Sequence, residues 1–392
     1  MQNSTFILED DQMMLVGVGI SNYVSGNLSD CNDFIQKNRG EYIFGLISYD
    51  VKNQLERLTS NNETGVEFPE LLFVVPESVI QITDGKIHFL QGEPNDKWDK
   101  DLEKIINSNA DLVEQENIEL KPRISKDEYL LKVDSLKRHI QLGDIYEVTF
   151  CQEFRAENAK IDPLNVYKRL SQITEAPFRC FVQWEHNFLL SGSPERFVKR
   201  EGNKLFSQPI KGTAKRSDDK EADEKNRRSL LESSKEKAEN VMIVDLVRND
   251  LSRIAKRNSV KVDELFGVYS FKTVHQLIST VSAEIESSKS FEEIIKALFP
   301  MGSMTGAPKI KAMELIEKYE HFKRGMFSGS VGLIKPNGDF DFNVIIRSIL
   351  YNEEKKLVSC PVGGAITIQS DPEAEYEECL IKLAALKKAL NP

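Results

Sequence analysis

The apolar positions of the first hundred or so residues predict short strands and one early helix. Strand-like apolar runs cover Tyr42–Tyr49 and Leu71–Val75, and prolines on both sides bound the second run. A helical pattern follows the first run, from Val51 to Leu58. The stretch Ser108–Pro122 is polar and acidic, so we interpret it as a connection between two parts of the chain.

The middle of the chain opens with a well-marked helix. Ser125 is followed three residues later by Glu128, which is a capping-box pattern, and an apolar stripe then runs to Gly143. Strand-like segments come next. They are Ile145–Phe154, Phe178–Glu185, Phe188–Gly192 and Lys204–Gln208.

In the rest of the chain, helices and strands alternate in groups. Helical segments are predicted over 217–255, with a break near Ser233 and Ser234, over Phe291–Phe299, and from Pro308 to about Tyr319. A turn at Pro336–Asp339 joins Phe327–Ile334 to Phe340–Tyr351 in a predicted hairpin, Leu357–Gln369 adds one or two strands, and a last helix starts at Asp371. This grouping favours an α+β fold with large, mainly antiparallel sheets over a doubly wound parallel sheet.

Composition and charge narrow the classes of function. The chain has 392 residues and a formal net charge of −10, and no cluster of Lys and Arg with interleaved aromatic residues stands out, so we expect no nucleic-acid partner. Its five cysteines are scattered and its five histidines lack metal-ligand spacing, which argues against zinc and a disulfide framework. No apolar run reaches the about 18 residues of a membrane span, and the N-terminus lacks a signal-peptide pattern. We therefore expect a cytoplasmic protein without a membrane partner.

Two predicted helices each carry a pair of glutamates three residues apart. The pairs are Glu236 with Glu239 and Glu375 with Glu378. This spacing puts each pair on one helix face, and Lys382 joins the second face. Such pairs are usually solvated surface, but the first leads into the apolar run Val241–Val244, which must be buried. Carboxylates beside a buried segment need a cation or strong hydrogen bonds, so the pairs are candidate ligands for Mg²⁺.

Three other features could contact anionic groups. Lys211, in Pro209-Ile210-Lys211-Gly212-Thr213, places an amine at a strand end beside accessible backbone N–H groups, although a plain structural turn is the alternative. The small-residue loop Gly302–Ala307 precedes a helix whose N–H groups could hold an anion, but the Walker A spacing is not met. Arg347, expected on the second hairpin strand, is either a structural ion-pair partner or a carboxylate clamp.

Five motifs, in order along the chain, resemble those of the chorismate-utilising enzymes. They are Ser193–Phe197, Pro209–Thr213, Ala238–Leu251, Gly302–Lys309 and Val362–Lys382. The family includes component I of anthranilate synthase and of aminodeoxychorismate synthase, isochorismate synthases and salicylate synthases. The resemblance covers residue 121 to the C-terminus and implies two sheets packed as a sandwich with flanking helices. It also divides the chain into an N-terminal region, 1–120, packed on a chorismate-binding catalytic domain, 121–392.

The resemblance suggests which nucleophile reaches the chorismate ring. Isochorismate and salicylate synthases have a water-activating lysine at the position of Glu147, which argues against them. Anthranilate synthases usually have a small residue at the position of Lys211. A lysine there is similar to aminodeoxychorismate synthases, in which this amine is thought to add to C2 before ammonia attacks C4. We therefore expect 4-amino-4-deoxychorismate, the precursor of p-aminobenzoate and folate, as the product. Anthranilate synthase component I, and less so a catalytically dead scaffold, are the alternatives.

The resemblance also implies a role for each matching residue. Lys211 would be the nucleophile, with a pKa lowered by a dry or cationic pocket, and Glu195 the general acid, with a raised pKa. Mg²⁺ would bind the ring carboxylate, held by Glu239 and Glu378 with Glu236 and Glu375 behind them. The substrate-binding residues would be Gly212, Thr213, Thr305, Arg347, Gly363 and Lys382. No glutaminase cysteine motif is present, so we expect ammonia from a separate glutamine amidotransferase subunit.

Three positions depart from the family pattern. Glu147 stands where relatives with this activity more often have glutamine, and Phe327 stands where a tyrosine is expected beside Arg347. Gln276 occupies the usual histidine position, with His275 one residue early. The N-terminal part lacks the LLES motif by which anthranilate synthases bind tryptophan, so we do not expect inhibition by tryptophan.

Overall fold

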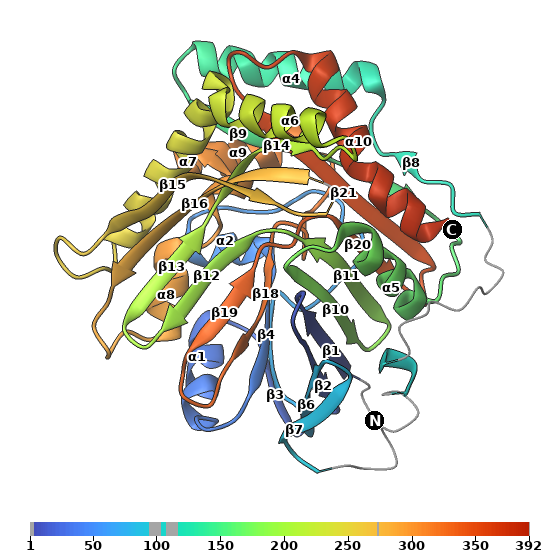
Figure 1. Cartoon of the computed structure of the whole chain (residues 1–392), viewed down its shortest axis with the longest axis vertical. Helices are drawn as coiled ribbons and strands as arrows, with labels where there is room; N and C mark the ends of the chain where they lie inside the picture. The colour runs from blue at the N-terminus through green and yellow to red at the C-terminus, as the bar shows by residue number, and fades with distance from the viewer. Residues whose placement is uncertain (1–3, 94–102, 107–116, 273, 392) are drawn as a thin grey trace.

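A computed structural model describes residues 4–93, 103–106, 117–272 and 274–391 (Figure 1). Two large sheets splay apart below a group of helices, and the described strand pairs are antiparallel. The predicted α+β fold with large, mainly antiparallel sheets is therefore confirmed.

The first sheet has 11 strands. Their order is β17 (Gly306–Ala307), β9 (Glu147–Ala156), β21 (Leu357–Ile366), β20 (Ser348–Asn352), β11 (Asn187–Ser193), β10 (Phe178–Trp184), β1 (Ser4–Glu9), β2 (Met14–Val18), β6 (Ser78–Thr83) and β7 (Lys86–Gln91), with β8 (Lys121–Pro122) beside β9.

The second sheet has 10 strands. Their order is β14 (Ile210–Lys215), β16 (Val274–Glu284), β13 (Lys204–Gln208), β12 (Arg196–Glu201), β19 (Phe340–Asn343), β18 (Ser330–Ile334), β4 (Ile43–Ile47), β5 (Leu71–Val75) and β3 (Asn22–Ser25), with β15 (Lys261–Ser270) beside β16.

Strands from the first 91 residues lie in both sheets, beside strands from the rest of the chain. In the first sheet β1 pairs with β10, and in the second β4 pairs with β18. The N-terminal region thus completes the same two sheets that carry the later motifs. The boundary at residue 120 stays a prediction, and residues 107–116 of the expected connection lie outside the described residues.

The helices cover the outer faces of the sheets. They are α1 (Leu28–Lys37), α2 (Lys52–Leu55), α4 (Lys126–Gln141), α5 (Pro163–Thr174), α6 (Lys220–Glu232), α7 (Ser234–Ser252), α8 (Phe291–Leu298), α9 (Lys309–Tyr319) and α10 (Pro372–Leu390), with short 3-10 turns η1 (Tyr49–Val51) and η2 (Gly302–Met304). The predicted break near Ser233 is confirmed, because Ser233 ends α6 and its side chain caps α7. Ser125 caps α4 as expected.

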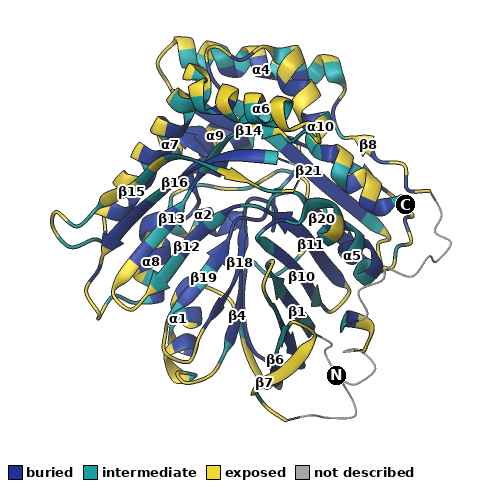
Figure 2. Ribbon diagram, viewed as in Figure 1, coloured by how far each residue is buried: buried dark blue, intermediate teal, exposed yellow. Residues whose placement is uncertain are grey.

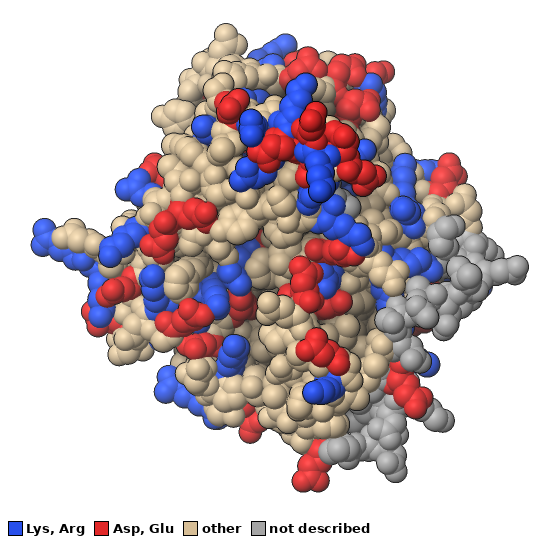
Figure 3. Space-filling view, viewed as in Figure 1, with Lys and Arg blue, Asp and Glu red and all other residues tan. Residues whose placement is uncertain are grey.

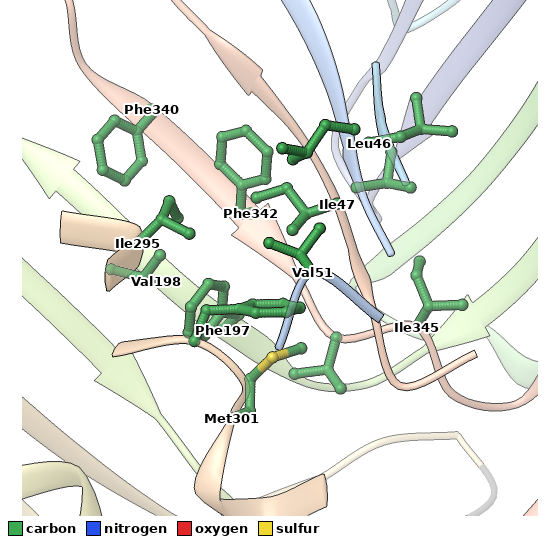
Figure 4. Close-up of a cluster of buried hydrophobic side chains, with 14 of the residues drawn as sticks. Leu46, Ile47, Val51, Phe197, Val198, Ile295, Met301, Phe340, Phe342 and Ile345 are labelled. Carbon is green, nitrogen blue, oxygen red and sulfur yellow. The ribbon is translucent and has the colours of Figure 1, made fainter. Parts of the chain in front are cut away.

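The buried residues form two layers of apolar side chains (Figure 2). One layer lies between the sheets and includes Phe6 of the first sheet, whose ring is 5.2 Å from that of Phe44 in the second. The same cluster continues on the other face of the second sheet, where the ring of Phe342 lies 5.5 Å from that of Phe291 in α8, and Figure 4 shows part of it. The other layer lies between the first sheet and helices α4, α5 and α10, and includes Tyr129 and Leu383. The first sheet is therefore buried on both faces, on one of them by α10, which carries Glu375 and Glu378.

The predicted hairpin is confirmed in its turn and first half, but its second strand is shorter than expected. That strand ends at Asn343, and the chain then crosses to the first sheet and continues as β20 from Ser348. The crossing is held by the hydroxyls of Ser193 and Ser191, which donate to the carbonyls of Val344 and Ile346. The prediction of one continuous strand to Tyr351 was therefore wrong. Residues at the crossing are buried between two sheets, so their apolar pattern resembles that of a strand.

Candidate active site

A lysine–glutamate pair joins the two sheets beneath the helices. Lys211 lies on β14 of the second sheet, and its Nζ is 2.9 Å from Oε1 of Glu147 at the start of β9 in the first sheet. The side chains of Lys211 and Glu147 are only 11% and 1% exposed. The amine that the sequence singled out is therefore inside the protein and not in bulk water.

The pKa of Lys211 is shifted in the direction opposite to the expected one. Burial lowers this pKa, but the negative charges of Glu147, Glu239 and Glu195 raise it, and the net effect is a raised pKa. Glu147 makes the largest of these contributions and also accepts a hydrogen bond from the amine. The carboxylate that stands in place of the more usual glutamine thus holds Lys211 as a cation in the absence of substrate.

Glu195 is a buried carboxyl group with a raised pKa. It directly precedes β12 and is 5% exposed. Burial raises its pKa to about 7, although hydrogen bonds from the Ser303 side chain and the Ile210 backbone, and the charge of Lys211, act to lower it. This is the direction expected for a general acid.

The two glutamate pairs lie in the first two turns of α7 and α10 and influence each other electrostatically. Burial raises the pKa of Glu239 to about 7, and the pKa of Glu236 is raised by burial and by the charge of Glu378. Burial and the charge of Glu378 also raise the pKa of Glu375. Glu378 differs because Lys382, 2.6 Å away, outweighs the effect of burial and lowers its pKa. The four carboxylates therefore lie near one another, with each pair on one face of its own helix.

The carboxylate oxygens and the glycines in this region suit a hard cation. Among residues that the structure describes, no three His, Cys, Asp or Glu side chains form a ready-made metal cluster. Mg²⁺ needs only one or two carboxylates and completes its coordination with water and substrate oxygens. Glycines leave the space open, because a Cβ on Gly212 would lie 2.9 Å from Oε2 of Glu236 and a Cβ on Gly364 would lie 3.1 Å from Oε2 of Glu375. The residues present thus fit Mg²⁺ held by one carboxylate of each pair.

The residues predicted to bind the ring carboxylate lie beside the glutamate pairs. Gly212 has a φ of +93° between Lys211 and Thr213, and Thr213 is exposed. On the other side, the Nζ of Lys382 donates to the carbonyl of Gly363 at 2.7 Å. Gly212 and Thr213 thus belong to β14 of the second sheet and Gly363 to β21 of the first sheet, while Lys382 belongs to α10.

Two of the predicted substrate-binding residues lie differently from what the sequence suggested. Arg347 is at the crossing between the sheets, with a φ of +51°, and not within a strand. Burial lowers its pKa while the charge of Glu378 raises it, and no hydrogen-bond acceptor for its guanidinium is found among the described residues. Thr305 is completely buried, and its hydroxyl donates to the carbonyl of Met301 within its own loop. Arg347 therefore has donors available for a ligand, whereas the Thr305 hydroxyl is already engaged.

Sequence reasoning missed two contacts that organise the site. The first is the Lys211–Glu147 pair, and the second is the hydrogen bond from Ser303 to Glu195. Ser303 also receives, at its carbonyl, the hydroxyl of Thr149 on β9. The motif containing Ser303 was recognised, but its partners are more than a hundred residues away in the chain, so no local pattern could reveal them.

The other departures from the family pattern have structural explanations. His275 is 1% exposed and its two ring nitrogens contact Asp223 and Ser270, at 3.0 and 2.8 Å, on the side of α6. Gln276 pairs with Thr213 across the strands, and its Oε1 is buried without a partner among the described residues. Phe327 belongs to the apolar layer between the sheets. His275 is thus a satisfied core residue, and Gln276 is the one that lies next to the site.

The fold and this acidic site define the class of protein. Residues 14–388 match the model of the chorismate binding enzyme family, and the chain belongs to that family. It is 33% identical over 351 residues to aminodeoxychorismate synthase component 1 of Escherichia coli (strain K12), covering 88% of this chain and 76% of that protein. It is 36% identical over 316 residues to the chloroplastic aminodeoxychorismate synthase of Arabidopsis thaliana, covering 80% of this chain but only 34% of the plant protein.

A solved structure supports the fold. Anthranilate synthase component I from Streptococcus pneumoniae TIGR4 superposes with a TM-score of 0.78 at 24% sequence identity, covering 97% of this chain and 90% of that one. The chain spans about a third of the length of the two plant relatives it matches.

Two further features are the distribution of charged side chains on the surface and the hydropathy of the helices. On the face shown in Figure 3, acidic and basic side chains are interspersed. Within the described ranges, no helix has the length and apolar character needed to cross a membrane.

Proposed function

We propose that this chain is the chorismate-aminating component I of an aminodeoxychorismate synthase. In this proposal it converts chorismate and ammonia to 4-amino-4-deoxychorismate in the cytoplasm, with Mg²⁺ as cofactor. A separate glutamine amidotransferase subunit supplies the ammonia, and the product serves p-aminobenzoate and folate synthesis. The observation that carries the proposal is the buried amine of Lys211, which lies among Glu147, Glu195 and Glu239.

The position of Lys211 supports a direct role in bond formation. A lysine buried only to anchor an ion pair would need one partner, whereas this one lies under the influence of three carboxylates. In the proposed reaction Lys211, once deprotonated, adds to C2 of the ring, the double bonds shift, and the bond from C4 to its hydroxyl breaks. Ammonia then attacks C4, the double bonds shift back, and Lys211 is released.

Glu195 is suited to protonate the leaving hydroxyl. With a pKa of about 7, it holds its proton in roughly half of the molecules at neutral pH. Donation of this proton lets the hydroxyl depart as water, which is a far better leaving group than hydroxide. Ser303 and the Ile210 backbone hold the carboxyl group through hydrogen bonds.

Substrate charge is balanced by groups from both sheets. Arg347 would hold the enolpyruvyl carboxylate, while Gly212, Thr213, Gly363 and Lys382 would surround the ring carboxylate. When bound by Glu239 and Glu378, with Glu236 and Glu375 behind them, Mg²⁺ would neutralise the ring carboxylate and stabilise developing charge. Thr305 would support the pocket through its loop, since its hydroxyl is already bonded.

The proposal is tested by mass spectrometry of the intact protein after incubation with chorismate and Mg²⁺ without ammonia. The expected result is an adduct on the wild type that is missing from Lys211→Ala. With ammonium added, chromatography should show 4-amino-4-deoxychorismate from the wild type only. Equal amination by both proteins would overturn the lysine mechanism, and anthranilate as the product, or no consumption of chorismate, would overturn the assignment.

A further inference from the structure

Only one of the two oxygens of the Glu147 carboxylate has a hydrogen-bond donor among the described residues. Its Oε1 accepts a hydrogen bond from Lys211, but its Oε2 is buried and has no donor among the described residues. Glu147 begins β9, where Ala307 of β17 pairs with it, and its side chain is 1% exposed. A buried charged oxygen without a hydrogen bond is costly for the folded protein. The Oε2 of Glu147 therefore has an open hydrogen-bonding position, while Oε1 is already in contact with the Lys211 amine.

Lys211 can react only after it loses a proton, and few groups can receive that proton. Glu195 lies nearby, but the proposed function requires it to keep its own proton for the leaving hydroxyl. The charge of Glu239 also acts on Lys211, but the proposed function needs Glu239 as a cation ligand. Glu147 is the carboxylate in direct contact with the amine, at 2.9 Å.

We infer that Glu147 is the catalytic base that takes the proton from Lys211 when the substrate binds. The inference rests on the proposed function. The Nζ–H bond of Lys211 breaks and the proton goes to Oε1 of Glu147, which converts the ion pair into a neutral amine and a neutral acid. The freed electron pair on Nζ forms the bond to C2, and the hydroxyl leaves with the proton of Glu195. After ammonia has displaced the lysine, Glu147 returns its proton and restores the pair.

Substrate binding provides the physical reason for the transfer. A bound ring displaces water from the space around Lys211, and removing water penalises a pair of ions more than a pair of neutral groups. A glutamine at this position could hold the lysine but could not take its proton.

The test compares Glu147→Gln with the wild type in the formation of the lysine adduct from chorismate and Mg²⁺ without ammonia. Loss of a general base typically slows a reaction by about 10²–10⁴-fold, so we expect adduct formation near pH 7 to fall by at least about 100-fold. The ratio of variant to wild-type rate should rise with pH, because the free-amine fraction grows about tenfold per pH unit below the pKa of the lysine. Glu147→Asp, which keeps a base, should restore part of the rate.

A second carboxylate on β9 serves as the matched control. Glu153 is 2% exposed and pairs with Arg123, on the same strand but without a contact to Lys211. Glu153→Gln should leave the adduct rate and its pH profile unchanged. Besides Glu147, the charged groups coupled to Lys211 are Glu195, Glu236, Glu239 and Glu378, and these stay unchanged in every variant.

Two outcomes of this experiment would overturn the inference. Adduct formation by Glu147→Gln at the wild-type rate or faster would overturn the inference, because it would mean that Glu147 only keeps Lys211 protonated. A slowing that does not change with pH would overturn it too, since that would indicate a purely structural loss. Neither result would affect the proposed function, which fails if the wild type forms no adduct, if Lys211→Ala aminates chorismate normally, if anthranilate is the product, or if chorismate is not consumed.

Discussion

At the scale of single residues, different physical effects set the charges of two buried groups in the site. Glu195 and Lys211 are close enough to affect each other, yet both have raised pKa values for different reasons. Burial dominates for Glu195 and makes it an acid that holds its proton near neutral pH. Neighbouring carboxylates dominate for Lys211 and keep it a cation. In the proposed reaction, Glu195 thus carries the proton for the leaving hydroxyl, and Lys211 must lose a proton before it can react.

Substitution of Glu195 should show whether its proton controls the pH dependence of kcat. A carboxyl group with a pKa of about 7 is protonated below that pH and loses its proton above it, so wild-type kcat should fall as pH rises through 7. Glu195→Gln should lower kcat by about 10²–10⁴-fold and remove this alkaline limb. Steady-state kinetics from pH 5.5 to 9 measure both effects. An unchanged alkaline limb in the variant would assign it to another group.

At the scale of elements, the start of a helix sets the position of the carboxylates. The hydroxyl of Ser233 accepts a hydrogen bond from the backbone N–H of Glu236, which fixes the first turn of α7. The same residue ends α6, so a single serine defines the break between two helices. Asp371 caps α10 in the same way, by accepting from the backbone N–H of Ala374 just before Glu375. Both glutamate pairs therefore depend on local caps that the sequence displays directly.

The cap of α7 can be tested against an equivalent cap elsewhere. Ser233→Ala and Ser125→Ala each remove a side-chain cap, from α7 and α4, and each should lower the free energy of unfolding by about 0.5–2 kcal/mol in urea titrations. Only Ser233→Ala should also raise the Mg²⁺ concentration needed for half-maximal activity, by about tenfold, because groups that orient metal ligands affect metal binding. An equal effect of both variants on the Mg²⁺ requirement would contradict a specific role for the α7 cap.

At the scale of the whole molecule, the two expected parts of the chain share their sheets. The first 91 residues supply β1, β2, β6 and β7 to one sheet and β3, β4 and β5 to the other. The apolar layer between the sheets mixes side chains from both parts, such as Phe44 with Leu350. We therefore expect the described chain to unfold as one cooperative unit.

Substitution of Phe44 tests this cooperativity. Its ring packs against Phe6, and a Cβ on Gly17 would come within 2.6 Å of it, so the side chain has no spare room around it. Phe44→Ala should lower the free energy of unfolding by about 3–5 kcal/mol. Circular dichroism and enzymatic activity should be lost at the same, lower, urea concentration. The exposed Ile87, replaced by Ala, should change stability by no more than about 0.5 kcal/mol. Separate transitions for the two signals would show two independent units.

The features predicted well from the sequence are those that local patterns determine. The helix break at Ser233, the cap at Ser125 and the placement of each glutamate pair on one face of its own helix follow from local spacing. The strand assigned through Arg347 failed because the chain there changes sheets, and burial by two layers resembles the pattern of a single strand. The helix α5 (Pro163–Thr174) was not predicted, although Asp162 and Pro163 mark its start.

The sequence by itself determined the class of fold, the placement of the four carboxylates on two helix faces, and the membership of a chorismate-binding family. These depend on periodicity, caps and ordered motifs, which act over a few residues. Only the tertiary structure decided that Glu147 meets Lys211, that Ser303 holds Glu195, and that Arg347 keeps its donors available. These contacts join residues far apart in the chain, and the resulting burial and charge set the protonation states on which the chemistry depends.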